Sequence, residues 1–314
     1  MAAATPRVFR AWLSAWALIC LGSCDLSAQQ AADKAFSAAV TNSAYALGRG
    51  PVVLIDEAHH NFHTADGRYA AFADLLRKDG YQVLPSKKVF SRDTFEKADV
   101  LVIANALHKS NLDSWTLPTP SAFTDAEIQA LSDWLRAGGS LLLIADHMPF
   151  PGAAAKLGRK LGFQFGNGYA RGPERSVFRK SDGLLKNHAI TTGRSAAETI
   201  TSVRTFTGQA FKAMEAVEPL LVFGEGHYLL LPQQANRFPE GTPRVEVNGW
   251  MHAAARRFGK GRVVVFGEAA MFSAQISSSK KPMGMNAPGA EQNRQLCLNV
   301  LHWLSGLLEP HKAR

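Results

Sequence analysis

From position 51 onward, the chain alternates between short apolar runs and stretches whose apolar residues recur at helical spacing. Each apolar run is too short for a helix and is bounded by Gly, Asp or Pro, so it predicts a buried strand. The first expected strands are Val52–Ile55, Tyr81–Leu84, Val100–Ala104 and Ser140–Ala145. Strands that alternate with amphipathic helices predict an α/β fold with a mainly parallel sheet covered on both faces.

The helices between these strands carry recognisable start and stop signals. One is expected over about residues 66–78 with Gly80 after it, and a short one over about residues 93–98. Thr124 and Glu127 have the spacing of a capping box, which predicts a helix that ends at Gly138-Gly139. A last helix is expected over Glu291–Leu307.

The alternation loosens between Gly158 and Gly249, where β-prone pieces and Gly-rich loops predict a β-rich elaboration in the second half. Regularity returns with Met251–Phe258, a Gly-Lys-Gly turn and Arg262–Phe266, which together predict a hairpin.

The start of the chain has the layout of an export signal. Arg7 and Arg10 precede an apolar stretch that is too short to span a bilayer, so residues 1–23 are expected to be a signal peptide. The sequence Leu-Gly-Ser-Cys that ends at Cys24 fits a bacterial lipobox, in which Cys24 is acylated, whereas ordinary cleavage after Ala28 is the alternative. The expected location is therefore the periplasm, or a membrane to which a lipid on Cys24 anchors the protein.

The expected domain organisation follows. Residues 24–50 would be a linker, residues 51–309 one α/β domain, and residues 310–314 a tail, because roughly 290 residues remain after the signal and suit one large domain.

The number of cysteines and the net charge limit the disulfides and the binding partners that can be expected. Of three cysteines, only Cys297 lies outside the signal region and its lipobox, so an internal disulfide is not expected. The formal net charge of +9 is dispersed over separate basic pairs without aromatic interleaving, which does not favour nucleic acid as a partner. An unknown small molecule or envelope ligand is expected instead.

The most informative segment runs from Val52 to His63. A short apolar strand leads directly into Asp56, Glu57, His59, His60 and His63, and the carboxyl ends of parallel strands are where open α/β sheets bind ligands. Two further strand ends carry the same kind of residue. They supply Asp146, His147 and Glu268.

The four residues that begin at Asp56 also spell a helicase box, Asp-Glu-Ala-His. That reading needs a preceding phosphate-binding loop with Gly-Lys-Ser/Thr, and residues 1–55 contain none. The chain is therefore not expected to be an NTPase.

A resemblance can be stated on four segments in order. They are Asp56–His59, Gly138–His147, Gly259–Glu268 and Asn299–Leu304. Together they resemble a bacterial family of unknown function with a class I glutamine amidotransferase-like domain. The resemblance implies a flavodoxin-like, three-layer, doubly wound domain over most of residues 51–308 and brings no established reaction.

The nucleophile of that enzyme class is missing. Amidotransferases place a cysteine on a tight strand-to-helix turn, but the comparable strand ends here carry Asp146-His147 and Asn105. Cys297 lies among apolar residues of a helix and is expected to fill the core. Gly-x-Ser-x-Gly is absent as well, so neither a glutaminase nor a serine hydrolase is predicted.

Two function classes remain open. In one, the protein is an exported hydrolase for a small polar or carbohydrate-like envelope substrate, with metal-assisted or acid/base chemistry. Its catalytic candidates are Asp56, Glu57, His59, Asp146, His147 and Glu268, and a divalent metal such as zinc would use His59, His63 and His147. In the other, the protein is a non-catalytic domain that binds a ligand or partner in the same cleft.

Structural roles are the alternative for each candidate residue. Asp56 and Asp146 would then accept hydrogen bonds from backbone amides at strand ends, His59 or His60 would be a satisfied buried imidazole, and Glu268 would cap a following turn. For His252, a structural or solvated role is expected.

Overall fold

The structure is a computed structural model that describes residues 1, 30–173 and 177–309. The expected signal peptide, Cys24 and the tail lie outside the described residues. Among the described residues, no helix has both the length and the apolar character needed to cross a membrane.

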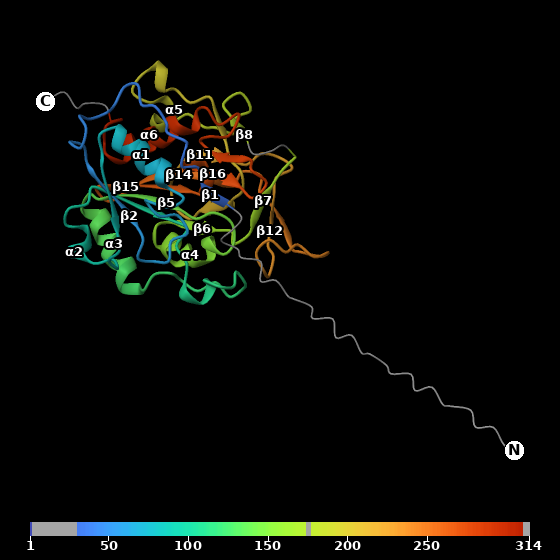
Figure 1. Ribbon diagram of the computed structural model, residues 1–314. Helices are drawn as coiled ribbons and strands as arrows, with labels where there is room; N and C mark the ends of the chain where they lie inside the picture. Colours follow the sequence, from blue (N-terminus) through green and yellow to red (C-terminus); the bar gives the residue numbers. More distant parts are fainter. Residues whose placement is uncertain (2–29, 174–176, 310–314) are drawn as a thin grey trace.

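A large mixed sheet forms the centre of the protein (Figure 1). Its parallel part runs in the order β3-β2-β4-β5-β15, and the antiparallel strands β14, β10 and β6 follow, with β11 paired to β14. The bounds are β2 Val52–Asp56, β3 Gln82–Ser86, β4 Val100–Ala104, β5 Ser140–Ile144, β6 Phe163–Phe165, β10 Phe211–Ala213, β11 Glu218–Val222, β14 Met251–Phe258 and β15 Gly261–Phe266. The predicted strands are confirmed, as is the hairpin of β14 and β15.

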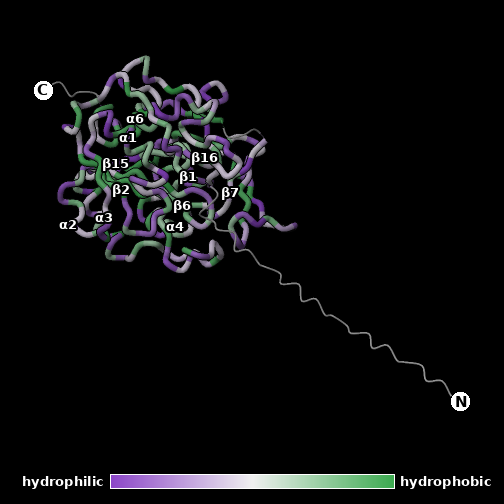
Figure 2. The backbone as a smooth tube through the Cα atoms, viewed as in Figure 1, coloured by the Kyte–Doolittle hydropathy of each residue, from purple (hydrophilic) through white to green (hydrophobic). Residues whose placement is uncertain are grey.

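Helices cover both faces of this sheet because its central strands are apolar on both sides. Along β4, Val102 and Ala104 pack in the core beneath α1 and α6, whereas Leu101 and Ile103 pack in the core beneath α3. Figure 2 shows the apolar interior along β2 and β15. The helices are α1 Ala70–Lys78, α2 Arg92–Phe95, α3 Asp125–Ala137, α4 Phe150–Lys160, α5 Ala189–Thr192 and α6 Asn293–Leu304. The protein is therefore an α/β protein with a large mixed sheet.

Helix α3 begins as its sequence predicts. The Thr124 side chain accepts a hydrogen bond from the backbone of Glu127, and the Glu127 side chain accepts one from the backbone of Thr124. The capping box is thus confirmed, and Gly138, with φ of 129°, ends the helix. Helix α4 was not predicted, because its Gly- and Pro-containing sequence lacks a strong start signal.

The second half is rich in short strands, as predicted. Strands β7, β12 and β13 form a small sheet, and β8 pairs with β9. Their bounds are β7 Tyr169–Arg171, β8 Val177–Arg179, β9 Ser202–Arg204, β12 Tyr228–Leu230 and β13 Arg244–Glu246.

The described part of the expected linker, from Gln30 onward, packs against the rest of the protein. Strand β1 (Gln30–Ala32) pairs with β16 (Ala274–Ser277), which in turn pairs with β17 (Pro282–Gly284). Ala38 is buried, and Tyr45 packs against the core. Residues 30–50 therefore belong to the folded body, and the boundary expected at residue 51 needs correction.

Candidate functional site

Strands β2, β4, β5 and β15 are adjacent and parallel, so their carboxyl ends lie along one edge of the sheet. At this edge, Asp56 ends β2, and Asn105 and Asp146 follow β4 and β5 closely. Glu268 follows β15 in the same way. The arrangement brings residues from distant parts of the sequence to one place, where their contacts divide them into separate groups.

The first group is a buried imidazole held between two carboxylates. His59 Nδ1 lies 2.9 Å from each Asp56 carboxylate oxygen, and His59 Nε2 lies 2.8 Å from Glu127 Oε1. The rings of Phe90 and Phe123 pack against the imidazole, with centroids 4.4 and 4.7 Å away. We call Asp56, His59 and Glu127 the carboxylate clamp.

The clamp favours a charged imidazole. Burial alone would lower the pKa of His59, but hydrogen bonds and the charges of Asp56 and Glu127 outweigh it, so the pKa is raised. Burial alone would raise the pKa of Glu127, yet hydrogen bonds from His59 and Thr124 hold this pKa below its usual value. Carboxylate oxygens only accept hydrogen bonds, so both ring nitrogens of His59 donate.

This geometry gives His59 a structural role. Neither ring nitrogen has a free lone pair, so His59 is not available as a metal ligand or a general base while the clamp is intact. Asp56 also accepts hydrogen bonds from the Ala58 backbone and the Asn61 side chain. Among the neighbouring candidates, Glu57 accepts the Ala65 backbone N–H at 2.9 Å, and His60 is exposed with a positive φ of 49°.

The second group is centred on Asp146, which is buried and accepts hydrogen bonds through both carboxylate oxygens. One carboxylate oxygen accepts the His147 backbone N–H at 2.7 Å and the Thr207 hydroxyl at 3.1 Å, and the other accepts the Ala269 backbone N–H at 3.0 Å. These contacts tie the ends of β5 and β15 to the loop that contains Thr207. Asp146 therefore joins segments of this edge that lie far apart in the sequence.

Glu268 lies beside Asp146 and is fully buried. Burial and the negative charge of Asp146 raise the pKa of Glu268 well above its usual value, which favours the protonated form of this side chain. One oxygen accepts the Met271 backbone N–H at 3.2 Å, where the 3₁₀ turn Ala270–Phe272 begins. Glu268 therefore caps the following turn.

Asn105 connects Asp146 to His63. Its side-chain oxygen accepts the Asp146 backbone N–H at 2.9 Å, and its amide nitrogen lies 3.3 Å from His63 Nδ1. An amide nitrogen only donates, so His63 Nδ1 accepts and the ring proton is on Nε2. Burial and the nearby positive charge of Arg68 lower the pKa of His63 to about 3, so this imidazole is neutral.

His147 is half-buried and differs from His59 and His63. Its Nδ1 donates to the backbone carbonyl of Met148 at 2.7 Å, so in the neutral imidazole the lone pair is on Nε2. The ring stacks on Tyr169 with a centroid distance of 4.4 Å and an interplanar angle of 14°. The stack and the hydrogen bond fix the direction of the Nε2 lone pair.

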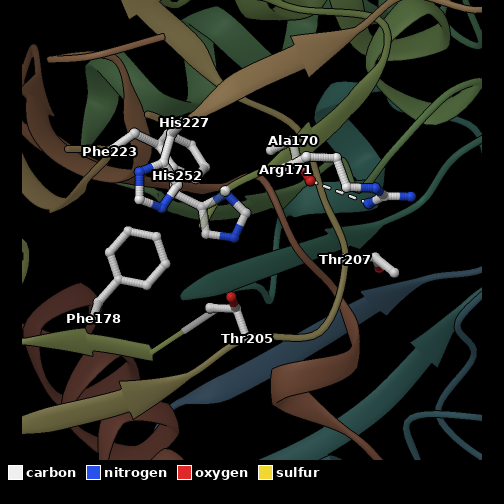
Figure 3. A pocket seen from close by; sticks show the side chains of 9 residues that line it. Ala170, Arg171, Phe178, Thr205, Thr207, Phe223, His227 and His252 are labelled. Carbon is white, nitrogen blue, oxygen red and sulfur yellow. Dashed lines mark hydrogen bonds between the residues drawn. The ribbon is translucent and has the colours of Figure 1, made fainter. Parts of the chain in front are cut away.

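Two further imidazoles line a small cavity close to Asp146 (Figure 3). His227 Nδ1 donates to the Gly224 carbonyl at 3.0 Å, and His252 Nδ1 donates to the Gln209 carbonyl at 2.8 Å. Thr207, whose hydroxyl donates to Asp146, also lines the cavity. We call this cavity the inner pocket. It has a volume of about 30 Å³ and is lined by Ala170, Arg171, Gly172, Phe178, Thr205, Thr207, Phe223, His227 and His252.

No sequence pattern singles out His227, and the sequence predicts a structural or solvated role for His252. A signal was nevertheless present in the predicted hairpin. Because β14 runs antiparallel to β15, its first residues lie beside the last residues of β15, with Ala253 opposite Phe266. The hairpin therefore brings His252 to the same edge as Glu268.

The candidate metal ligands do not form a site in this structure. The described residues contain no group of three or more His, Cys, Asp or Glu side chains placed to hold a metal ion. His59 is engaged through both ring nitrogens, and His63 already accepts a hydrogen bond through Nδ1. The donors at this edge therefore do not fit the expected zinc site.

Comparisons with known proteins bear on the fold alone. No family model matches the chain, and no curated protein matches it. Among solved structures, the chain is similar to the mmIFT52 N-terminal domain, with a TM-score of 0.56 and 15% identity over 81% of this chain and 97% of that one. A putative ThuA-like protein from Bacteroides uniformis matches with a TM-score of 0.45 and 13% identity over 86% of this chain and 95% of that one.

Proposed function

We propose that the protein is an exported ligand-binding domain that holds a small polar, carbohydrate-like molecule at the carboxyl edge of its sheet. One observation carries the proposal: both carboxylate oxygens of Asp56 and of Asp146 are engaged within the protein, whereas the neutral imidazoles of His147, His227 and His252 keep Nε2 as an acceptor. Neutral acceptors in fixed positions suit recognition of a ligand that donates hydrogen bonds.

The acids support binding more than catalysis. Asp56 is paired with His59, Asp146 accepts from three donors, and Glu268 is fully buried, with a pKa that burial and the charge of Asp146 raise. A general acid and a general base must both reach the substrate. A completely buried acid such as Glu268 does not meet that requirement unless the edge rearranges.

The test is calorimetric titration of the purified mature protein with glucose, myo-inositol and glycerol at millimolar concentrations. We expect at least one of these to bind, and His147→Ala or Thr207→Val to weaken that binding about tenfold or more. His60→Asn is the matched control, because His60 is exposed and asparagine tolerates its positive φ. Absence of binding, or equal binding by all variants, would contradict the proposal.

A hydrolase that uses His147 as its base is the second candidate function. The orientation of His147 favours it, since a half-buried imidazole with Nδ1 fixed on a carbonyl presents a basic Nε2. Release of p-nitrophenol from a panel of p-nitrophenyl glycosides is the measurement. Turnover that His147→Ala abolishes while His60→Asn leaves it intact would favour the enzyme over the binding domain.

We further propose that the parallel part of the sheet belongs to the amidotransferase-like, three-layer type. The order β3-β2-β4-β5-β15 with helices on both faces supports this. Export is proposed on the sequence of residues 1–28, and intact-mass analysis of envelope fractions tests it. A diacylated Cys24, or an N-terminus at Gln29, would support export, and a protein that keeps Met1 would contradict it.

A further inference from the structure

The inner pocket holds an imidazole with an acceptor that nothing else in the described structure uses. His252 is 1% exposed, its Nδ1 donates to Gln209, and its Nε2 has no hydrogen-bond partner among the described residues. Buried polar atoms normally have partners, so an unpartnered one beside a cavity indicates a group that enters the cavity. Figure 3 shows the His252 ring directed into the space above Thr205.

The protein holds this imidazole rigidly. The ring stacks on Phe178 at an interplanar angle of 10° and packs against Phe223 with centroids 5.0 Å apart. At Gly208, with φ of 121°, a Cβ would lie 2.5 Å from His252 Cε1, so only glycine leaves room for the ring. A rigid, pre-oriented acceptor is what specific recognition of a small ligand group requires.

Two other residues of the pocket, His227 and Thr207, add acceptors to that of His252. His227 Nε2 carries a lone pair because Nδ1 donates to Gly224, and the Thr207 hydroxyl proton is directed at Asp146, which leaves the Thr207 oxygen to accept. Arg171 is the cationic group of the lining, and its guanidinium donates one hydrogen bond through Nη1 to the Ala170 carbonyl and lies over the rings of Tyr169 and Phe238.

The surroundings disfavour an anion. His252 has its pKa lowered to about 4, chiefly by burial, so it is neutral and does not attract negative charge at neutral pH. A larger cleft of about 430 Å³ shares Phe178 and His227 with the inner pocket and is lined by two acids, Asp182 and Glu225. The inner pocket itself, at about 30 Å³, has room for one or two groups the size of a hydroxyl.

We propose that the inner pocket is a subsite for a hydroxyl group of a neutral polyol or sugar, which donates its hydrogen bond to His252 Nε2 while the body of the ligand lies in the adjoining cleft. This deepens the proposed function and rests on it. It assigns His252, His227 and Thr207 as the residues that select a neutral hydroxylated ligand over an anionic one.

The decisive variant is His252→Asn, which keeps a donor near the position of Nδ1 and removes the Nε2 acceptor. His60→Asn carries the same substitution at an exposed residue of the same edge and is the matched control. Glucose and myo-inositol are the neutral probes, and inorganic phosphate is the anionic one. Each is titrated calorimetrically into the wild-type protein and both variants at pH 7.

We expect the neutral probes to bind the wild type, and His252→Asn to weaken this binding about tenfold while His60→Asn leaves it unchanged. Because an asparagine could also loosen the core, His252→Gln is measured in parallel. Its longer side chain brings an amide oxygen back toward the position of Nε2, so part of the affinity should return.

The outcomes separate the two proposals. Polyol binding that depends on His147 but is unchanged in His252→Asn overturns the subsite and leaves the binding function in place. Phosphate that binds more tightly than the polyols, and more tightly still at pH 5, overturns the choice of a neutral ligand. No binding of any probe overturns both.

Discussion

His59 Nε2 lies 2.8 Å from Glu127 Oε1, and this contact joins the loop after β2 to the first turn of α3. The same carboxylate accepts hydrogen bonds from the Phe90 backbone and from Thr124, so one side chain connects three separate segments. The edge of the sheet is therefore held in place by a buried ionic contact before any ligand binds.

We expect Glu127→Gln to lower the free energy of unfolding by roughly 2 kcal/mol, because it removes one partner of a buried charge. Chemical denaturation at pH 6 measures it. Asp125→Asn is the matched control in the same turn, since Asp125 pairs with Lys156 at the exposed surface and should contribute less than about 1 kcal/mol. Equal losses in the two variants would contradict a structural role for the clamp.

The clamp should also have a characteristic pH dependence. The raised pKa of His59 gives a contribution that is complete below its ordinary value of 6.5 and is lost as the pH rises through the folded-state pKa. The lowered pKa of Glu127 gives a contribution that is complete above 4.5 and is lost as the pH falls through the folded-state pKa. The difference between wild type and Glu127→Gln should therefore be largest between pH 4.5 and 6.5.

Denaturation series from pH 3 to pH 9 check this window. A difference that stays constant across the series would show that His59 does not carry its charge in the clamp.

The clamp illustrates what the sequence could and could not predict. The strand Val52–Ile55 and the capping box of Thr124 and Glu127 depend on local patterns, and both are confirmed. The contact between His59 and Glu127 depends on how α3 packs beside the end of β2, which no local pattern records. A histidine beside two acids in the sequence therefore suggested a metal ligand, although both its nitrogens are used internally.

The inner pocket was missed for a similar reason. Its residues come from β7, β8, the loop after β9, the loop before β12 and the start of β14, and all except His252 lie within the irregular region between Gly158 and Gly249. Only His252 had a predictable position, through the hairpin with β15. The parallel core could be predicted from short apolar runs, whereas the β-rich elaboration depends on long-range pairing.

We expect the stability of the fold to change differently when the carboxyl group of Glu268 and that of Asp146 are each replaced by an amide. Glu268→Gln replaces a side chain whose protonated form is favoured by burial with an uncharged one of the same shape, so the fold should be retained. Asp146→Asn loses an acceptor for at least one backbone N–H and should cost about 1.5–3 kcal/mol. Urea denaturation of both variants at pH 7 provides the comparison.

The pH dependence of Glu268→Gln gives a sharper check. Because the folded state holds its proton to a higher pH than the unfolded state, Glu268 lowers stability progressively as the pH rises above 4.5. The free energy of unfolding of the variant should therefore increase relative to that of the wild type as the pH rises, with a limiting slope of about 1.4 kcal/mol per pH unit. A difference independent of pH would mean that Glu268 is ionised in the folded protein.

Cys297 should be unreactive in the native protein. The thiol is fully buried in α6, and burial raises its pKa, so little thiolate is available to react. Iodoacetamide should modify Cys297 only after denaturant unfolds the chain. Peptide mass spectrometry distinguishes it from Cys20 and Cys24, and labelling under native conditions at the unfolded rate would contradict its burial.

Gly80 tests whether residues 30–50 belong to the folded body. Gly80 has φ of 97°, and a Cβ at this position would lie 2.4 Å from the carbonyl oxygen of Tyr45. Gly183 also has a positive φ, of 68°, but a Cβ there would meet nothing within 4 Å.

Gly183→Ala should lower the free energy of unfolding by about 1 kcal/mol, because it introduces backbone strain alone. Gly80→Ala should lower the free energy of unfolding by about 1–3 kcal/mol more than Gly183→Ala does, because it also forces apart the packed backbone around Tyr45. Thermal and urea denaturation of the two variants measure the difference. Equal costs would mean that the segment around Tyr45 does not press on Gly80, and it would restore the view of residues 30–50 as a linker.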